Sequence, residues 1–208
     1  SRQPSERIAV IAIDDQSIAN LGRWPWSRDI HAKFIDKLAE AKTKTIVYTA
    51  FFTEPQVDPG LVFIRKMKAA LGSTAEPTET NDQLNRLIAE AETALDTDAI
   101  LASSIKNAGN VLLPSVFTLG EPQGKPDNAL PGFALKSAVD DPSNFSLAAV
   151  RAQEPIESLG SVAAGVGHLN QFQDVDGAVR QEPLLVNYYG KAVPSMALLG
   201  AATSLNLT

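Results

Sequence analysis

Cysteine is absent from the 208 residues. This absence excludes a disulfide framework, a thiolate zinc site and a cysteine nucleophile. It leaves the compartment open, because a chain without thiols suits an oxidising space as well as a reducing one. Long apolar runs are absent too: no stretch approaches the roughly 18 residues of a membrane-spanning helix, and no signal-peptide pattern opens the chain. We therefore expect a soluble piece of a longer protein.

Clustered positive charge is also missing. The 18 Lys and Arg residues stand against 24 Asp and Glu, which gives a formal net charge of −6, and no basic block occurs. Phosphate binding needs grouped basic side chains, so we expect no nucleic-acid partner. The motifs G-x-S-x-G, Walker A, G-x-G-x-x-G and H-E-x-x-H do not occur either. An enzymatic function would therefore rest on carboxylates alone.

What the chain does contain is a globular composition with alternating strand and helix patterns. Its 44% apolar and 20% charged residues are near globular averages. Residues 8–13 (I-A-V-I-A-I) form an apolar run that is typical of a strand buried on both faces. Residues 28–41 show helical spacing, and residues 44–52 read as a second strand. Together these segments predict a right-handed βαβ unit.

Later segments extend this pattern. We predict helices at residues 61–71, 84–95 and 97–108, strands at 111–117 and 167–170, and a helix at 194–205 with Pro194 in its first turn. Proline and glycine mark residues 118–144 as a loop-rich excursion. A turn at 174–177 leads into residues 178–189, which predicts a hairpin. The predicted fold class is α/β: a mainly parallel central sheet flanked by helices, with a helical insertion at about 57–95 and a late antiparallel hairpin, in one domain covering 1–208.

Acidic side chains follow the first two predicted strands. Asp14 and Asp15 end the first, and Glu54 follows the second. Ligands of parallel α/β sheets sit beyond the carboxyl ends of the strands, and paired carboxylates there would hold Mg²⁺ or act as acid and base. The alternative is that Asp14 or Asp15 caps the next turn through an Asx hydrogen bond.

The densest feature is the segment G-R-W-P-W-S-R at residues 22–28. Trp24 and Trp26 beside Arg28 would form an aromatic and cationic shelf for an anionic or planar ligand. In the alternative interpretation the two indoles plug the end of the sheet, and Ser27 caps the following helix. His31, one turn into that helix, is either a titrating group or a hydrogen-bonded structural residue.

Two further motifs lie late in the chain. His168 and Asn170 share one strand face and, with Asp14 or Asp15, would form a polar cluster. The segment at 174–177 (D-V-D-G) resembles the start of a calcium loop, but Leu185 stands where the closing glutamate is needed.

A structural turn is therefore the favoured interpretation of that segment. It would be made by Asp174, Asp176 and Gly177, with Arg180 pairing to Asp176 across the hairpin. We predict no catalytic residue, no metal site and no cofactor.

The order of these motifs resembles the type-2 CHASE family, the extracellular sensory domains associated with cyclases and histidine kinases. The resemblance is carried by these blocks: I-D-D-Q-S-I (13–18), L-G-R-W-P-W-S-R-x-x-H (21–31), F-F-T-E-P (51–55), D-A-I-L-A (98–102), N-V-L-L-P (110–114), G-H-L-N (167–170), D-x-D-G-x-V-R (174–180) and P-S-M-A-L (194–198). Together they span nearly the whole chain.

The resemblance implies a non-catalytic receptor domain on the periplasmic or extracellular side of an inner membrane. It implies flanking transmembrane helices and a cytoplasmic effector: a histidine kinase, an adenylate or diguanylate cyclase, or a Ser/Thr kinase. The ligand would be a small molecule or ion, and a homodimer would suit such effectors. The expected ligand-binding residues are Asp14, Asp15, Trp24, Trp26, Arg28, Glu54, His168 and Asn170. Two alternatives remain at this point: a metal-dependent hydrolase or phosphotransferase using Asp14, Asp15 and Glu54, and a mechanical dimerisation domain without a ligand.

Overall fold

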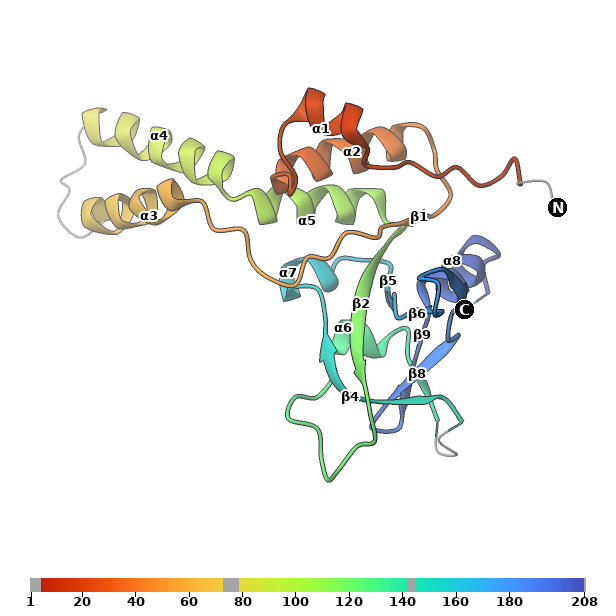
Figure 1. The fold of residues 1–208 in the computed structure, drawn as a ribbon. Helices are drawn as coiled ribbons and strands as arrows, with labels where there is room; N and C mark the ends of the chain where they lie inside the picture. The colour runs from red at the N-terminus through yellow and green to blue at the C-terminus, as the bar shows by residue number, and fades with distance from the viewer. Residues whose placement is uncertain (1–4, 73–78, 142–144, 208) are drawn as a thin grey trace.

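The longest strand, β2 (Val111–Leu119), is the centre of a mixed seven-stranded sheet in the computed structural model of the chain. The structure describes residues 5–72, 79–141 and 145–207. Along its first half, β2 pairs in parallel with β1 (Ile46–Val47) on one side and with β5 (Gly165–His168) on the other. Along its second half it pairs antiparallel with β4 (Leu147–Gln153). One strand therefore links two parts of the molecule (Figure 1).

The lower part of the sheet continues from β4. Strand β8 (Leu185–Tyr188) pairs with β4 in parallel, β9 (Lys191–Pro194) pairs with β8 antiparallel, and β3 (Val139–Asp140) is the last strand. The predicted α/β class, with parallel strand pairs flanked by helices, is confirmed. Three antiparallel pairs accompany the three parallel ones, so the sheet is mixed.

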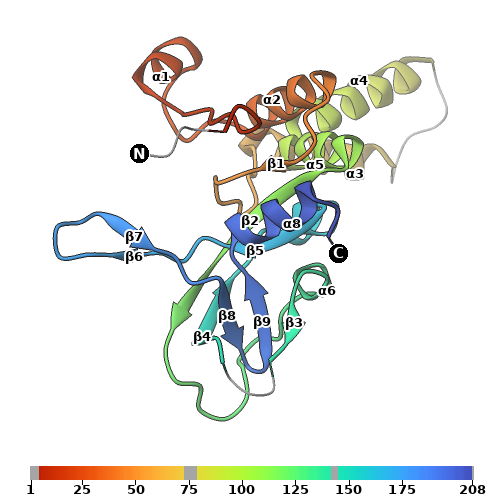
Figure 2. The same cartoon turned by 90° about the vertical axis from the view of Figure 1, so that its right-hand side faces the viewer.

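The predicted late hairpin is confirmed as well. Strands β6 (Phe172–Gln173) and β7 (Val179–Gln181) pair antiparallel in a small sheet of their own. In Figure 2 this hairpin projects from the body of the molecule, on the same side as α1 (Asp15–Leu21).

Two hydrophobic cores flank the long strand. In the upper core, α2 (Arg28–Glu40) and α5 (Thr97–Ala108) pack together against the parallel strands, with α7 (Glu157–Gly160) beside them. Its fully buried side chains include Ile35, Leu101, Ile105, Val111, Leu113 and Leu159.

The lower core lies against the second half of β2. It is formed by α6 (Gly132–Leu135) and the surrounding strands, and its buried side chains include Phe117, Phe133, Val166, Val186, Tyr188 and Val193. Helix α8 (Met196–Ser204) packs on β5, β2 and β1. This approach is close because β5 carries Gly167: a Cβ there would stand 3.2 Å from the sulfur of Met196 and 3.3 Å from the side chain of Leu199, both on α8.

Helices α3 (Pro59–Gly72) and α4 (Glu79–Leu95) pack on each other and project to one side (Figure 1). They occupy the segment that we interpret as a helical insertion, of which residues 73–78 lie outside the described residues. The last three residues of the excursion at 118–144 lie outside them too.

The prediction of a strand at residues 8–13 is wrong. The segment has no strand partner, and its apolar side chains are exposed: Ile8 to 74%, Val10 to 89% and Ile11 to 60%. The apolar pattern of a strand does not specify the backbone partner that a strand needs. The chain then enters α1 at once, because Asp14 caps that helix.

Other boundaries also differ from the sequence prediction. Pro194 ends β9, and Ser195 caps α8 with its side chain accepting from the Leu198 N–H. Residues 178–189 are divided between β7 and β8. Strand β4 was not predicted, since alanine and arginine break up its apolar alternation (L-A-A-V-R-A-Q).

Candidate functional site

The tryptophan-rich segment lies at the start of α2, on the upper part of the molecule. Trp26 is buried, and its Nε1–H donates to the Gly22 carbonyl oxygen at 2.8 Å. Trp24 packs edge-on against Trp26 at 5.4 Å between ring centroids and remains 37% exposed. One indole is therefore core, and the other offers ring surface to solvent.

His31 joins these indoles to the core. It is buried among Trp24, Tyr48 and Phe52, at centroid distances of 5.7, 5.8 and 5.3 Å. A hydrogen bond of 2.6 Å links its Nδ1 to the Tyr48 hydroxyl. Burial, and then the nearby Arg28 charge, lower the pKa of His31, while burial raises the pKa of Tyr48. Both rings are therefore neutral at pH 7, which fits a structural role for His31.

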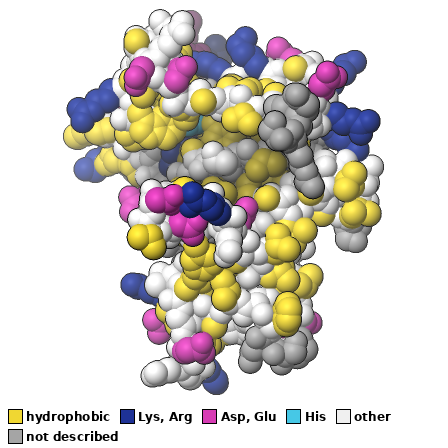
Figure 3. All heavy atoms as spheres, turned by 45° about the vertical axis from the view of Figure 1, so that its right-hand side comes forward, with side chains coloured by type: hydrophobic (Ala, Val, Ile, Leu, Met, Phe, Trp, Pro, Cys, Tyr) yellow, Lys and Arg dark blue, Asp and Glu magenta, His cyan; other side chains and the backbone are white. Residues whose placement is uncertain are grey.

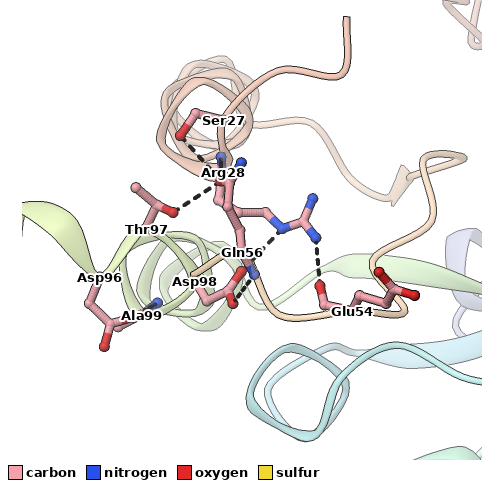
Figure 4. A network of polar contacts seen from close by, with 8 residues as sticks. All are labelled: Ser27, Arg28, Glu54, Gln56, Asp96, Thr97, Asp98 and Ala99. Carbon is pink, nitrogen blue, oxygen red and sulfur yellow. Dashed lines mark hydrogen bonds and ion pairs between the residues drawn. The ribbon is translucent and has the colours of Figure 1, made fainter. Parts of the chain in front are cut away.

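Arg28 lies on the other side of Phe52 and is held by internal partners. Its Nε donates to Asp98 at 3.1 Å, and an Nη donates to the Glu54 carbonyl oxygen at 3.0 Å (Figure 4). Its guanidinium carbon stands 4.4 Å from the centre of the Phe52 ring. The side chains of Arg28 and Asp98 are only 12% and 13% exposed. This ion pair connects α2 to α5 and directs the Arg28 side chain toward partners inside the domain.

Gln56 completes the network, which sequence reasoning missed. Its Oε1 accepts from the Arg28 backbone N–H at 2.7 Å, and also from the hydroxyls of Ser27 and Thr97 at 3.2 and 3.0 Å. Its own backbone N–H donates to Asp98 at 2.8 Å. One side chain thus holds the first residues of two helices together (Figure 4). A lone glutamine in a loop gives no pattern that would have revealed this role.

The predicted acidic cluster does not form. Asp14 is an exposed helix cap: it accepts from the Ser17 N–H at 2.8 Å, and its own N–H donates to the Ser17 hydroxyl at 2.8 Å. The Ser17 hydroxyl also donates to the Asp14 carboxylate at 2.6 Å, and this bond, together with the one from the Ser17 N–H, lowers the pKa of Asp14. Asp15 is the first residue of α1, and the exposed Glu54 contributes only its carbonyl oxygen to the network. Within the described part of the chain, no three His, Asp or Glu side chains gather as metal ligands.

His168 and Asn170 lie together at the end of β5, away from the tryptophan segment. The Asn170 amide accepts from the Phe117 N–H at 2.9 Å and donates to the Phe117 carbonyl at 2.6 Å. The Asn170 side chain thereby continues the backbone hydrogen bonding along this edge of β2, beyond the point where β5 ends. The His168 Nδ1 accepts from the Asn170 N–H at 3.2 Å. Among residues 5–72, 79–141 and 145–207, no hydrogen bond, ion pair or ring contact connects these two side chains to Trp24 or Arg28.

The segment at 174–177 is the turn of the projecting hairpin. The Gly177 N–H donates to the Asp174 carbonyl oxygen at 2.8 Å, and Gly177 adopts a φ of 78°, which favours glycine. Arg180 forms ion pairs of 2.7 Å with Asp174 and with Asp176. These carboxylates are therefore engaged by an arginine within the hairpin.

Glu154, directly after β4, is a further feature without a sequence signal. Both carboxylate oxygens are buried without a hydrogen-bond partner, and burial raises the pKa of Glu154 to about 7. His168 has a similarly unsatisfied atom: its Nε2 is buried without a hydrogen-bond partner within the described residues. Burial lowers the pKa of His168 to about 4. Both groups lie at ends of strands that pair with β2.

Comparison with protein-family models gives a match over the whole chain. The protein-family model described as CHASE2 domain matches residues 1–208, the whole chain. No curated protein and no solved structure matches. None of the helices in the described residues has the length and apolarity to cross a membrane.

Proposed function

The chain belongs to the CHASE2 domain family, whose members are sensory domains of signal-transduction receptors, and from this premise we propose that it is the extracytoplasmic sensing domain of a membrane-bound receptor. It binds a small ligand and passes the signal through flanking transmembrane helices to a cytoplasmic histidine kinase, nucleotide cyclase or Ser/Thr kinase. CHASE2 domains are generally extracellular and are sensory rather than catalytic.

The observation that carries the ligand-binding part is the exposed ring of Trp24 on a buried aromatic cluster. Trp26 and His31 support this ring from below, so it needs little ordering before a ligand stacks on it. Arg23 beside it is exposed and has no ion-pair partner within the described residues, whereas Arg28 is consumed internally. An exposed aromatic ring whose neighbour in the sequence is an exposed arginine suits a planar anion.

The hydrogen-bond network of Arg28 and Gln56 would carry an effect of ligand binding at Trp24 into the domain. The shelf of Trp24 and Arg23 leads directly into α2, and Arg28 and Gln56 fix the start of α2 to the start of α5. A ligand that prefers one arrangement of these helices shifts the balance between arrangements by its difference in affinity. About 1.4 kcal/mol of preference changes that balance tenfold.

The proposal is tested by thermal-shift measurements on the domain with planar carboxylates, beginning with benzoate and nicotinate. At least one compound should raise the melting temperature in a concentration-dependent way. Trp24→Ala should abolish the rise, and Arg23→Gln should weaken binding about tenfold, as expected for one charge-assisted contact.

Phe145→Ala is the matched control, because Phe145 is a 92% exposed aromatic residue on the lower part of the molecule. It should leave the rise unchanged. A ligand that stabilises Trp24→Ala as much as the wild type, or a panel without any stabilising planar anion, would overturn the proposed site.

A further inference from the structure

Residues 8–13 carry the apolar pattern of a buried strand without being buried. The backbone groups of residues 9–13 make no hydrogen bond within the described residues, and no side chain in the six-residue run is charged. Figure 1 shows this arm as an extended trace that leaves the body of the molecule, and Figure 3 shows hydrophobic side chains exposed over the upper part. The adjoining α1 has no buried residue either. The whole arm is therefore scarcely packed on its own chain.

The same chain presents an open strand edge. Strand β1 is the terminal strand of the sheet, with β2 as its neighbour. The N–H of Tyr48 donates to Leu112 of β2, and the N–H of Ile46 donates to Asn110, directly before β2, both at 3.0 Å. Since alternate residues of a parallel strand face opposite neighbours, the N–H and C=O of Val47 point to the outer edge. No hydrogen bond of Val47 exists within the described residues, and its side chain is 43% exposed.

The faces beside this edge suit a strand that is apolar on both sides. On one face, α8 approaches β1 so closely that a Cβ on Gly200 would stand 2.8 Å from the Val47 side chain. On the other face, Ile46 and Tyr48 belong to the upper core under α2. A strand added here would have apolar neighbours above and below, and the run I-A-V-I-A-I is apolar at both sets of alternate positions.

We propose that residues 8–13 of one copy add as a strand to the β1 edge of a second copy, and that the exchange is reciprocal. An exposed β-prone run and an unpaired edge are the two halves of strand addition. When one chain carries both and the arm lies off its own body, two copies related by a twofold axis satisfy each other. The proposal is independent of the ligand and of the membrane context.

Single cysteines test this inference cleanly because the chain has none of its own. The variants Ile11→Cys and Val47→Cys are mixed in equal amounts and oxidised mildly. The proposal predicts a disulfide-linked species of twice the chain mass that contains both variants, since only pairing between copies joins them. Ile11→Cys mixed with Val175→Cys is the matched control, because Val175 is fully exposed on the projecting hairpin, and should give no such species above background.

Light scattering after size exclusion supplies a second readout. The wild-type domain should be a dimer, and Val10→Asp should halve the mass. The variant should still unfold in a cooperative thermal transition, because Val10 is 89% exposed within its own chain. Val175→Asp should remain a dimer. A monomeric wild type would overturn the proposal, because it would show that the copies do not pair. A crosslink that forms inside the double variant Ile11→Cys/Val47→Cys and never in the mixture would also overturn it, because it would show that the arm pairs with β1 of its own chain.

Discussion

At the scale of single residues, two buried titratable side chains without hydrogen-bond partners make the stability of the fold depend on pH in opposite directions. Glu154 and His168 are both buried without partners for their titrating atoms, and burial favours the neutral form of each. For Glu154 the folded-state pKa of about 7 lies above the ordinary 4.5, so protonated Glu154 contributes stability that is complete below pH 4.5 and is lost as the pH rises through 7. For His168 the folded-state pKa of about 4 lies below 6.5, so its contribution is lost as the pH falls from 6.5 towards 4.

Glu154→Gln should therefore stabilise the domain above pH 7. Glutamine keeps the shape and is never charged, so the variant avoids the cost of a buried carboxylate. The difference in unfolding free energy between variant and wild type should grow by about 3 kcal/mol between pH 4.5 and 8, from a pKa shift of about 2.5. Urea denaturation of both proteins across this range measures the difference, and taking the difference removes the His168 contribution.

Glu121→Gln serves as its control, since Glu121 is exposed. Its difference from the wild type should stay near zero at every pH. A flat difference for Glu154→Gln would contradict the assignment of a neutral carboxyl at pH 5.

Asn170→Ala should destabilise the domain by about 1–3 kcal/mol, because it leaves both polar backbone groups of Phe117 without partners. Asn20→Ala, at an exposed position on α1, should change stability far less. The midpoints of chemical denaturation compare the two variants. Equal midpoints for Asn170→Ala and the wild type would show that the amide does not extend the β2 ladder.

At the scale of elements, a shielded ion pair between Arg28 and Asp98 joins α2 to α5, in addition to their packing in the upper core. Removing Asp98 alone leaves the Arg28 guanidinium nearly buried without its carboxylate, so Asp98→Ala should cost about 3 kcal/mol. Removing Arg28 as well should restore part of this loss. A double-mutant cycle with Arg28→Met, read by chemical denaturation, should give a coupling energy of about 1–3 kcal/mol. Additive effects would mean that the pair does not join the two helices.

The elements also show how far sequence reasoning reaches. The sequence predicts α2, α4 and α5 because each has an apolar stripe or a recognisable cap, and β2 because a continuous apolar run is typical of a buried strand. Residues 8–13 carry an equally clear strand pattern yet find no partner, since pairing depends on where the rest of the chain lies. The candidate site, like the secondary-structure elements, could be predicted from the sequence only in part. The tryptophan segment is visible as a motif, but Gln56 comes to accept hydrogen bonds from the first residues of two helices only through folding.

At the scale of the whole molecule, β2 ties an upper and a lower core into one sheet. The candidate ligand shelf belongs to the upper part, where its aromatic cluster merges with the core at Tyr48 and Phe52. His168 and Asn170 belong to the junction with the lower part. The two parts are connected through β2, which is hydrogen-bonded to β1 and to β5.

Tryptophan fluorescence tests the central claim most directly, because of the two tryptophans of the chain one forms the proposed ligand shelf and the other packs against it. The domain is titrated with the planar carboxylate that stabilises it most in the thermal-shift panel. The account predicts a saturable change in emission whose midpoint matches the midpoint of thermal stabilisation, and its loss in Trp24→Ala. Stabilisation by the ligand with unchanged emission, and with equal affinity in Trp24→Ala, would contradict ligand sensing at this shelf.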